Sequence, residues 1–101
     1  MDAKAVYERD ASYFVPVDEH TEWGVGDYIY MKGCGGNDGL NGELFCTVTK
    51  VNSNSLHFTS IVKGHTHWPD RYNNVDKCEW LVRCQKEVNR VVLRRSKEVF
   101  I

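Results

Sequence analysis

The sequence lacks any hydrophobic run close to the roughly 18 to 20 residues that a membrane-spanning helix needs. Its first five residues also lack the apolar stretch of a secretory signal. We therefore expect a cytoplasmic protein without a membrane partner. No strong catalytic, metal-binding or nucleotide-binding motif is present, so we expect neither enzymatic activity nor a cofactor.

Closely spaced cysteine pairs are also missing. Cys34, Cys46, Cys78 and Cys84 are separated by intervals of 12, 32 and 6 residues, whereas structural zinc sites usually take their ligands as close pairs on tight turns. A disulfide framework is not expected without a secretory signal. We expect most of these cysteines to be packing residues, with Cys46 facing the core.

His65 and His67, with Asp70 nearby, place two imidazoles and a carboxylate in one segment. Residues two apart on an extended segment point the same way, so a metal is conceivable there. No further ligand is evident, and we interpret the segment as a solvated loop without a metal.

What is present is an ordinary globular composition, with 42% hydrophobic and 27% charged residues in 101. These values exclude collagen-like, low-complexity and disordered classes, and the length suits one domain. We expect a single domain over 1–101. Within it we expect an N-terminal arm at 1–22, a barrel core at 23–84 and a basic C-terminal segment at 85–101.

Alternating apolar residues predict a mainly β (α+β) fold. Residues 28–31 are expected to form a strand, and residues 43–51 and 55–62 alternate on either side of an Asn-Ser-Asn turn, which predicts a hairpin. Good helix formers near the start predict a short helix or a frayed arm before Pro16. The five glycines within 33–42 predict a mobile loop.

The C-terminal third is harder to interpret. Residues 63–74 carry turn residues and predict a surface loop. After Asp76, alternation at 78–84 indicates a strand, whereas the apolar positions from Leu81 to Val92 also fit one helical face. The spacing of Asp76 and Glu79 favours a helix. Because an isolated hairpin needs more sheet, we expect a strand over 78–84 and then a helix or strand over about 86–95.

The segment from Trp23 to Met31, the glycine-rich loop ending at Gly42, the following strand and the Leu56-His57-Phe58 strand resemble small SH3-like barrels of the KOW and Tudor group. Gly26-Asp27 corresponds to their opening turn, and the resemblance covers residues 23–62. It implies a five-stranded barrel with a strongly bent hairpin and no catalysis. Such modules typically contact nucleic acid, a ribosome, a polymerase or a peptide through loops at one rim.

Charge is distributed unevenly, although the net charge is only −1. Residues 1–50 carry nine acids and four bases, whereas residues 51–101 carry five acids and nine bases. Such asymmetry can orient a molecule on a charged partner. A plainer interpretation is a solvated surface that keeps the protein soluble.

Two functional hypotheses follow. In the first, a non-enzymatic accessory or regulatory module contacts nucleic acid or a nucleoprotein machine through an aromatic and basic loop and the basic C-terminal segment, because aromatic and arginine side chains stack on bases and neutralise phosphates. The candidate contact residues are Trp68, Arg71, Tyr72, Arg90, Arg94 and Arg95. For Trp68, packing against an open end of the core is an equal alternative to contact with a partner.

In the second hypothesis, an acidic front docks on a basic surface of a protein partner and blocks or redirects it, as small inhibitors of viral origin do. Its residues are Asp18, Glu19 and Glu22, with Asp27 nearby. The near-neutral net charge favours this hypothesis over a dedicated DNA binder.

Overall fold

The computed structural model describes residues 2–33, 42–53, 55–62, 71–75 and 79–97. Helices and strands in these ranges follow one another as α1 (Ala3–Asp10), the 3-10 helix η1 (Ala11–Tyr13), β1 (Val15–Pro16), β2 (Tyr28–Lys32), β3 (Glu43–Val51), β4 (Leu56–Val62), β5 (Arg71–Val75), α2 (Glu79–Lys86) and β6 (Val91–Arg95). No helix in this part of the chain has the length and apolarity needed to cross a membrane.

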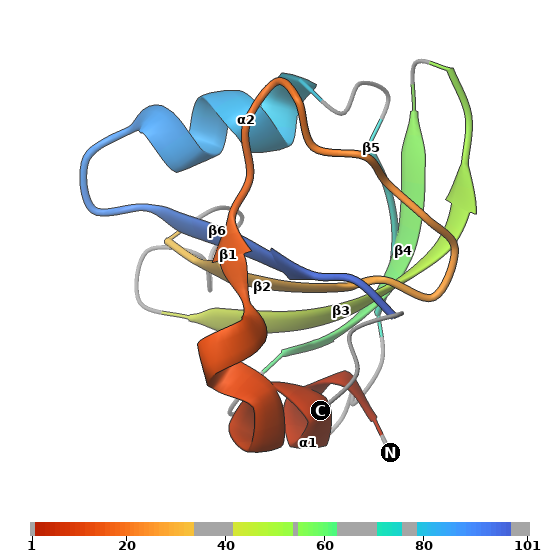
Figure 1. Ribbon diagram of the computed structural model, residues 1–101, viewed down its shortest axis with the longest axis vertical. Helices are drawn as coiled ribbons and strands as arrows, with labels where there is room; N and C mark the ends of the chain where they lie inside the picture. Colours follow the sequence, from red (N-terminus) through yellow and green to blue (C-terminus); the bar gives the residue numbers. More distant parts are fainter. Residues whose placement is uncertain (1, 34–41, 54, 63–70, 76–78, 98–101) are drawn as a thin grey trace.

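The six described strands form one antiparallel sheet in the order β1-β6-β2-β3-β4-β5 (Figure 1). Strands β2 to β5 follow one another as a meander. The chain then passes through α2 and returns as β6, between β1 and β2. The predicted mainly β, α+β fold is confirmed, and the sheet is open, with β1 and β5 at its edges.

The predicted hairpin is confirmed, because β3 and β4 pair antiparallel. Alternation along a strand places successive side chains on opposite faces of the sheet. In β3, Cys46 and Val48 are buried in one hydrophobic cluster and Phe45 in another. The register shifts between Val48 and Lys50, and both strands bend sharply in this region (Figure 1). A register shift of this kind is typical of a β-bulge, which bends a strand and increases its twist.

The larger cluster lies between the sheet and α2. Leu81 and Cys84 of α2 are 0% and 1% exposed, and their three-residue spacing puts both on one helical face. The buried members of this cluster are Val17, Ile29, Met31, Cys46, Val48, Leu56, Phe58, Leu81, Cys84 and Val92. The predicted core position of Cys46 is therefore confirmed.

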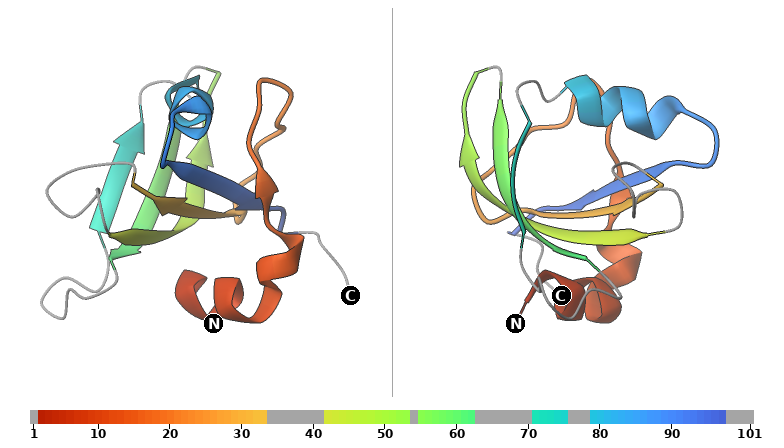
Figure 2. Two further views of the ribbon diagram at one scale, coloured as in Figure 1. Left: turned by 90° about the vertical axis from the view of Figure 1, so that its left-hand side faces the viewer. Right: turned by 180° about the vertical axis from the view of Figure 1, so that it is seen from behind.

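The smaller cluster lies between α1 and the opposite face of the sheet, so the two helices cover different faces (Figures 1 and 2). Its buried residues are Ala3, Val6, Phe14, Tyr30 and Phe45. Tyr7 stacks on Tyr30 with ring centroids 4.0 Å apart. Asp2 caps α1, since its Oδ1 accepts a hydrogen bond from the Ala5 amide at 2.8 Å.

Two predictions of local structure are wrong. The expected strand over 78–84 falls largely within α2, where the helical period buries Leu81 and Cys84. The expected surface loop over 63–74 is wrong for residues 71–74, which belong to β5 and pair with β4; residues 63–70 lie outside the described ranges. In addition, α1 packs on the sheet and β1 pairs with β6.

Candidate functional site

The acidic residues predicted to contact a protein lie in the segment 17–27 that joins β1 to β2. A compact turn opens this segment. The Asp18 Oδ1 accepts a hydrogen bond from the His20 amide at 2.8 Å, and the Asp18 amide donates to Thr21 Oγ1 at 2.9 Å. The main chain closes the same turn, because the Thr21 amide donates to the Asp18 carbonyl at 3.2 Å. These bonds fix the loop locally.

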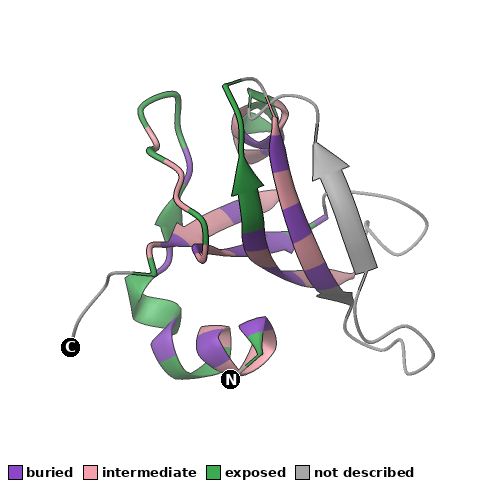
Figure 3. Cartoon of the chain, turned by 90° about the vertical axis from the view of Figure 1, so that its right-hand side faces the viewer, coloured by how far each residue is buried: buried purple, intermediate pink, exposed green. Residues whose placement is uncertain are grey.

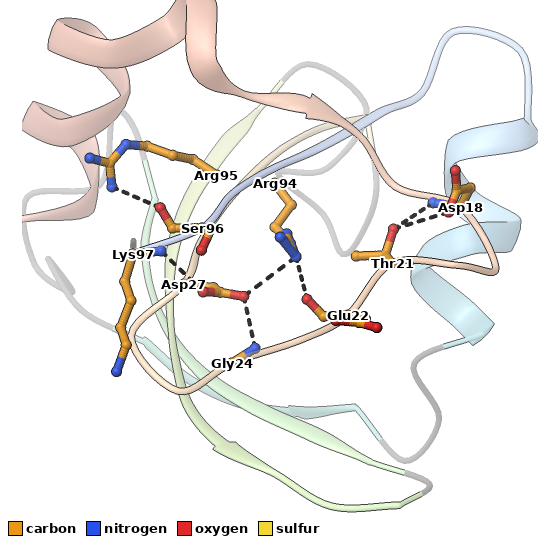
Figure 4. A network of polar contacts seen from close by, with 9 residues as sticks. All are labelled: Asp18, Thr21, Glu22, Gly24, Asp27, Arg94, Arg95, Ser96 and Lys97. Atoms are coloured by element: carbon orange, nitrogen blue, oxygen red, sulfur yellow. Dashed lines mark hydrogen bonds and ion pairs between the residues drawn. The ribbon is translucent and has the colours of Figure 1, made fainter. Parts of the chain in front are cut away.

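Arg94 of β6 anchors the second half of this segment (Figure 4). One of its terminal nitrogens, Nη1, donates to the Glu22 carbonyl and lies 3.7 Å from Asp27 Oδ2. The Asp27 carboxylate also accepts hydrogen bonds from the Gly24 amide at 2.8 Å and the Lys97 amide at 3.1 Å. The guanidinium further lies over the Trp23 ring, 5.8 Å from its centroid.

These contacts hold the loop while leaving three of its carboxylates at the surface. Asp18, Glu19 and Glu22 are all exposed, and we call the range 18–22 the acidic loop. Much of the segment that joins β1 to β2 has the colour of exposed residues in Figure 3. Asp27, by contrast, is only 2% exposed. Its expected place in the acidic front is wrong, because it serves as the internal acceptor on which Arg94 and two amides converge.

Glu19 links the acidic loop to α2. Its Oε2 lies 3.5 Å from Lys86 Nζ, and both side chains are more than half exposed. A backbone hydrogen bond and the Lys86 charge lower the pKa of Glu19 below its ordinary value. Such exposed ion pairs are screened by solvent and hold a charge in place more than they add stability. Glu19 is therefore ionised at neutral pH.

The three candidate arginines of the basic C-terminal segment are not gathered on one surface. Arg94 and Arg95 are neighbours on β6, so their side chains point to opposite faces of the sheet, and each meets a buried carboxylate. Arg90 precedes β6 and pairs with Glu87 at 2.7 Å. Its Nη1 also lies 3.8 Å from the buried Cys84 sulfur.

Arg95 belongs to a buried ion pair that the sequence did not reveal. Its Nη2 lies 3.1 Å from Asp10 Oδ2, with only 7% and 1% of the two side chains exposed. Arg9 is a second cation beside Asp10 and donates two hydrogen bonds to its carboxylate, at 2.7 and 2.9 Å. These bonds, together with the Arg95 charge, lower the pKa of Asp10. The group joins α1 to β6.

The other predicted groups are only partly located. Arg71 and Tyr72 are in β5, at one edge of the sheet, whereas Trp68, His65, His67 and Asp70 lie outside the described residues. Cys46 and Cys84 are free and buried, and burial raises the pKa of the Cys46 thiol. Cys34 and Cys78 also lie outside the described ranges.

Within the described ranges no three His, Cys, Asp or Glu residues are grouped to hold a metal ion. Comparison of the chain with protein-family models, curated proteins and solved structures gives no match.

Proposed function

We propose that this protein is a non-enzymatic accessory module that binds a basic surface of a protein partner through the acidic loop. One observation supports this most. Arg94 holds the main chain at Glu22, while Asp18, Glu19 and Glu22 stay exposed. A loop fixed before binding loses less conformational freedom on association. Exposed charges then favour rapid encounter with a surface of opposite sign.

The placement of the arginines favours this hypothesis over nucleic-acid binding. Arg94 and Arg95 would have to leave Asp27 and Asp10 to neutralise phosphates. The buried Asp27 would then lose its ion pair, and the buried Asp10 would keep only Arg9. Removing one partner of a buried ion pair is strongly unfavourable. Phosphate contact would depend on the other basic residues.

We further propose that the sheet is an open variant of the SH3-like barrel. The support is the Gly26-Asp27 turn before β2 and the sharply bent hairpin of β3 and β4 (Figure 1). Gly26 adopts a φ of 92°, which is readily accessible to glycine. In this interpretation α1 and β1 are additions to a five-strand unit made by β2 to β6.

Charge reversal in the acidic loop tests the proposed function. The E19K/E22K variant leaves Asp18, which organises the turn, unchanged. Binding is measured first to a lysine- and arginine-rich decapeptide by NMR, and then to the partner captured from lysate. We expect chemical-shift changes centred on residues 18–22 in the wild type. The variant should lose affinity by at least roughly tenfold, because exposed charges at the rim of an interface steer the partner toward it.

E8K/E87K is a control with the same change of charge on α1 and the turn after α2. It should keep most of the affinity. Equal losses in the two variants would show a response to net charge only and would contradict the proposal. Binding to a DNA duplex that weakens linearly with log salt, with shifts outside the acidic loop, would favour the nucleic-acid hypothesis instead.

A further inference from the structure

The two edges of the sheet differ in what they offer to another strand. At one edge, β1 has two residues, and the second is Pro16, which has no amide hydrogen to donate. At the other edge, β5 has five residues, an ordinary strand length. Only the β5 edge is long enough to form a regular ladder with an added strand.

The β5 strand pairs with β4 without a break in register, from Leu56 opposite Val75 to Ser60 opposite Arg71. No described strand pairs with its other side. In an antiparallel sheet the backbone groups of an edge strand alternate, so that every second residue directs its amide and carbonyl away from the sheet. The complement of such a row is another extended chain.

The sequence of β5 contains little that would block this edge. Natural sheets protect their edges with proline, lysine, bulges or very short strands. The β5 residues are Arg-Tyr-Asn-Asn-Val, without proline, glycine or lysine, and the pairing of β5 with β4 has no bulge between Arg71 and Val75. Arg71, at one end, is the single charged residue of the strand.

We propose that β5 is an interaction edge that pairs antiparallel with β5 of a second copy, so that the two sheets become continuous. The strand is compatible with itself. A twofold axis at Asn73 places residue 71 opposite residue 75 and residue 72 opposite residue 74, so no like charges face each other. A net charge of −1 adds little repulsion between copies.

This arrangement leaves the acidic loop accessible. Figure 2 shows β5 and the segment joining β1 to β2 on opposite sides of α2. The dimer would therefore present two acidic loops, but the pairing of β5 does not depend on what these loops bind. Dimerisation and charge-dependent binding can succeed or fail separately.

Sedimentation analysis from micromolar to millimolar protein tests the proposal, together with amide exchange on the wild-type chain. We expect a monomer–dimer equilibrium. With increasing concentration, exchange should slow at alternate amides of β5 and not at Val15 of β1. A monomer at all concentrations would overturn the proposal, and so would a dimer whose β5 exchange does not respond to concentration.

The substitutions N73P and N74P supply a matched pair. Neighbouring amides of a strand point to opposite sides, so one proline removes a donor to β4 and the other removes a donor at the open edge. The proline that removes the open-edge donor should lower the Tm less than the proline that removes the donor to β4. In that variant we expect the dissociation constant of the dimer to rise at least tenfold. A dimer retained in that variant would place the interface elsewhere and contradict the proposal.

Discussion

Asp10 and Asp27 are the buried carboxylates among the described residues, and each meets an arginine of β6. The surroundings of the two acids differ. Asp10 is paired with two guanidinium groups, whereas Asp27 accepts two backbone amides besides its ion pair. Both arrangements satisfy a charge that would be costly to bury alone. They also commit Arg94 and Arg95 to the fold.

The lowered pKa of Asp10 predicts a specific loss of stability in acid. The Arg9 hydrogen bonds and the Arg95 charge depress this pKa in the folded state. Its stabilisation is therefore complete above the ordinary aspartate pKa of about 3.9. It is lost as the pH falls from there through the folded-state pKa. We expect the Tm of the wild type to decrease over this range.

The D10N variant checks whether Asp10 is the origin of this acid dependence. It should have a lower Tm at pH 7 and a shallower acid dependence below about pH 4, because its side chain no longer titrates. Thermal melts of both proteins between pH 2 and 7 measure the difference, with E8Q as a control at an exposed position. Parallel pH profiles for D10N and the wild type would contradict the assignment.

Sequence reasoning missed these pairs for a physical reason. Asp10 and Arg95 stand at opposite ends of the described chain, and no local spacing connects them. Only the pairing of β6 with β1 and β2 brings them together. Exposure of Glu19 and Glu22, in contrast, agrees with the preference of charged side chains for water.

The element α2 shows how one buried side chain anchors a short helix. Leu81 is fully buried and Arg83 is exposed on the same helix. We expect L81A to lower the free energy of unfolding by about 2–5 kcal/mol, since it removes packing and leaves a cavity. The matched R83A should change it by no more than about 0.5 kcal/mol.

Urea denaturation of both variants measures this contrast. A loss in R83A equal to that in L81A would show that helix propensity or surface charge, and not burial, determines the stability of α2. Far-UV circular dichroism at zero denaturant checks that the variants start from the same folded state. The comparison isolates packing because both substitutions introduce alanine into one helix.

The strand–helix ambiguity after residue 76 arose because Cys84 satisfies both periodicities. The sequence cue that favoured a helix was correct, but the need for more sheet was met elsewhere, by β5 and β6. Asn89, with a φ of 64°, lies in the turn between α2 and β6 and helps to separate them. The hairpin of β3 and β4 was predictable because its pairing is local.

For the whole molecule, the sheet is shared by both hydrophobic clusters, so we expect them to unfold together. Phe45 belongs to the cluster under α1, and its neighbour Cys46 belongs to the cluster under α2. Loss of either face would expose apolar surface of the same strand. A single cooperative transition is the expected result for a domain of this size.

Three probes measure the unfolding transition in the W68F variant, in which Trp23 and Trp80 are the remaining tryptophans. Far-UV circular dichroism follows the sheet and helices, and fluorescence follows Trp23 and Trp80 beside the larger cluster. The difference in near-UV circular dichroism between this protein and its Y7F variant follows the stacked Tyr7 and Tyr30. We expect the three melting curves to coincide. A tyrosine signal lost several degrees earlier would show that α1 detaches before the sheet unfolds.

The central position of β6 has a consequence for how the chain acquires its structure during synthesis. The partner of β1 and the second neighbour of β2 is β6, which the ribosome makes only after every other described element. Until then, β1 has no strand beside it and Asp10 lacks Arg95. Translation should therefore yield a nascent meander first, and attachment of the N-terminal residues should follow as a late, long-range step.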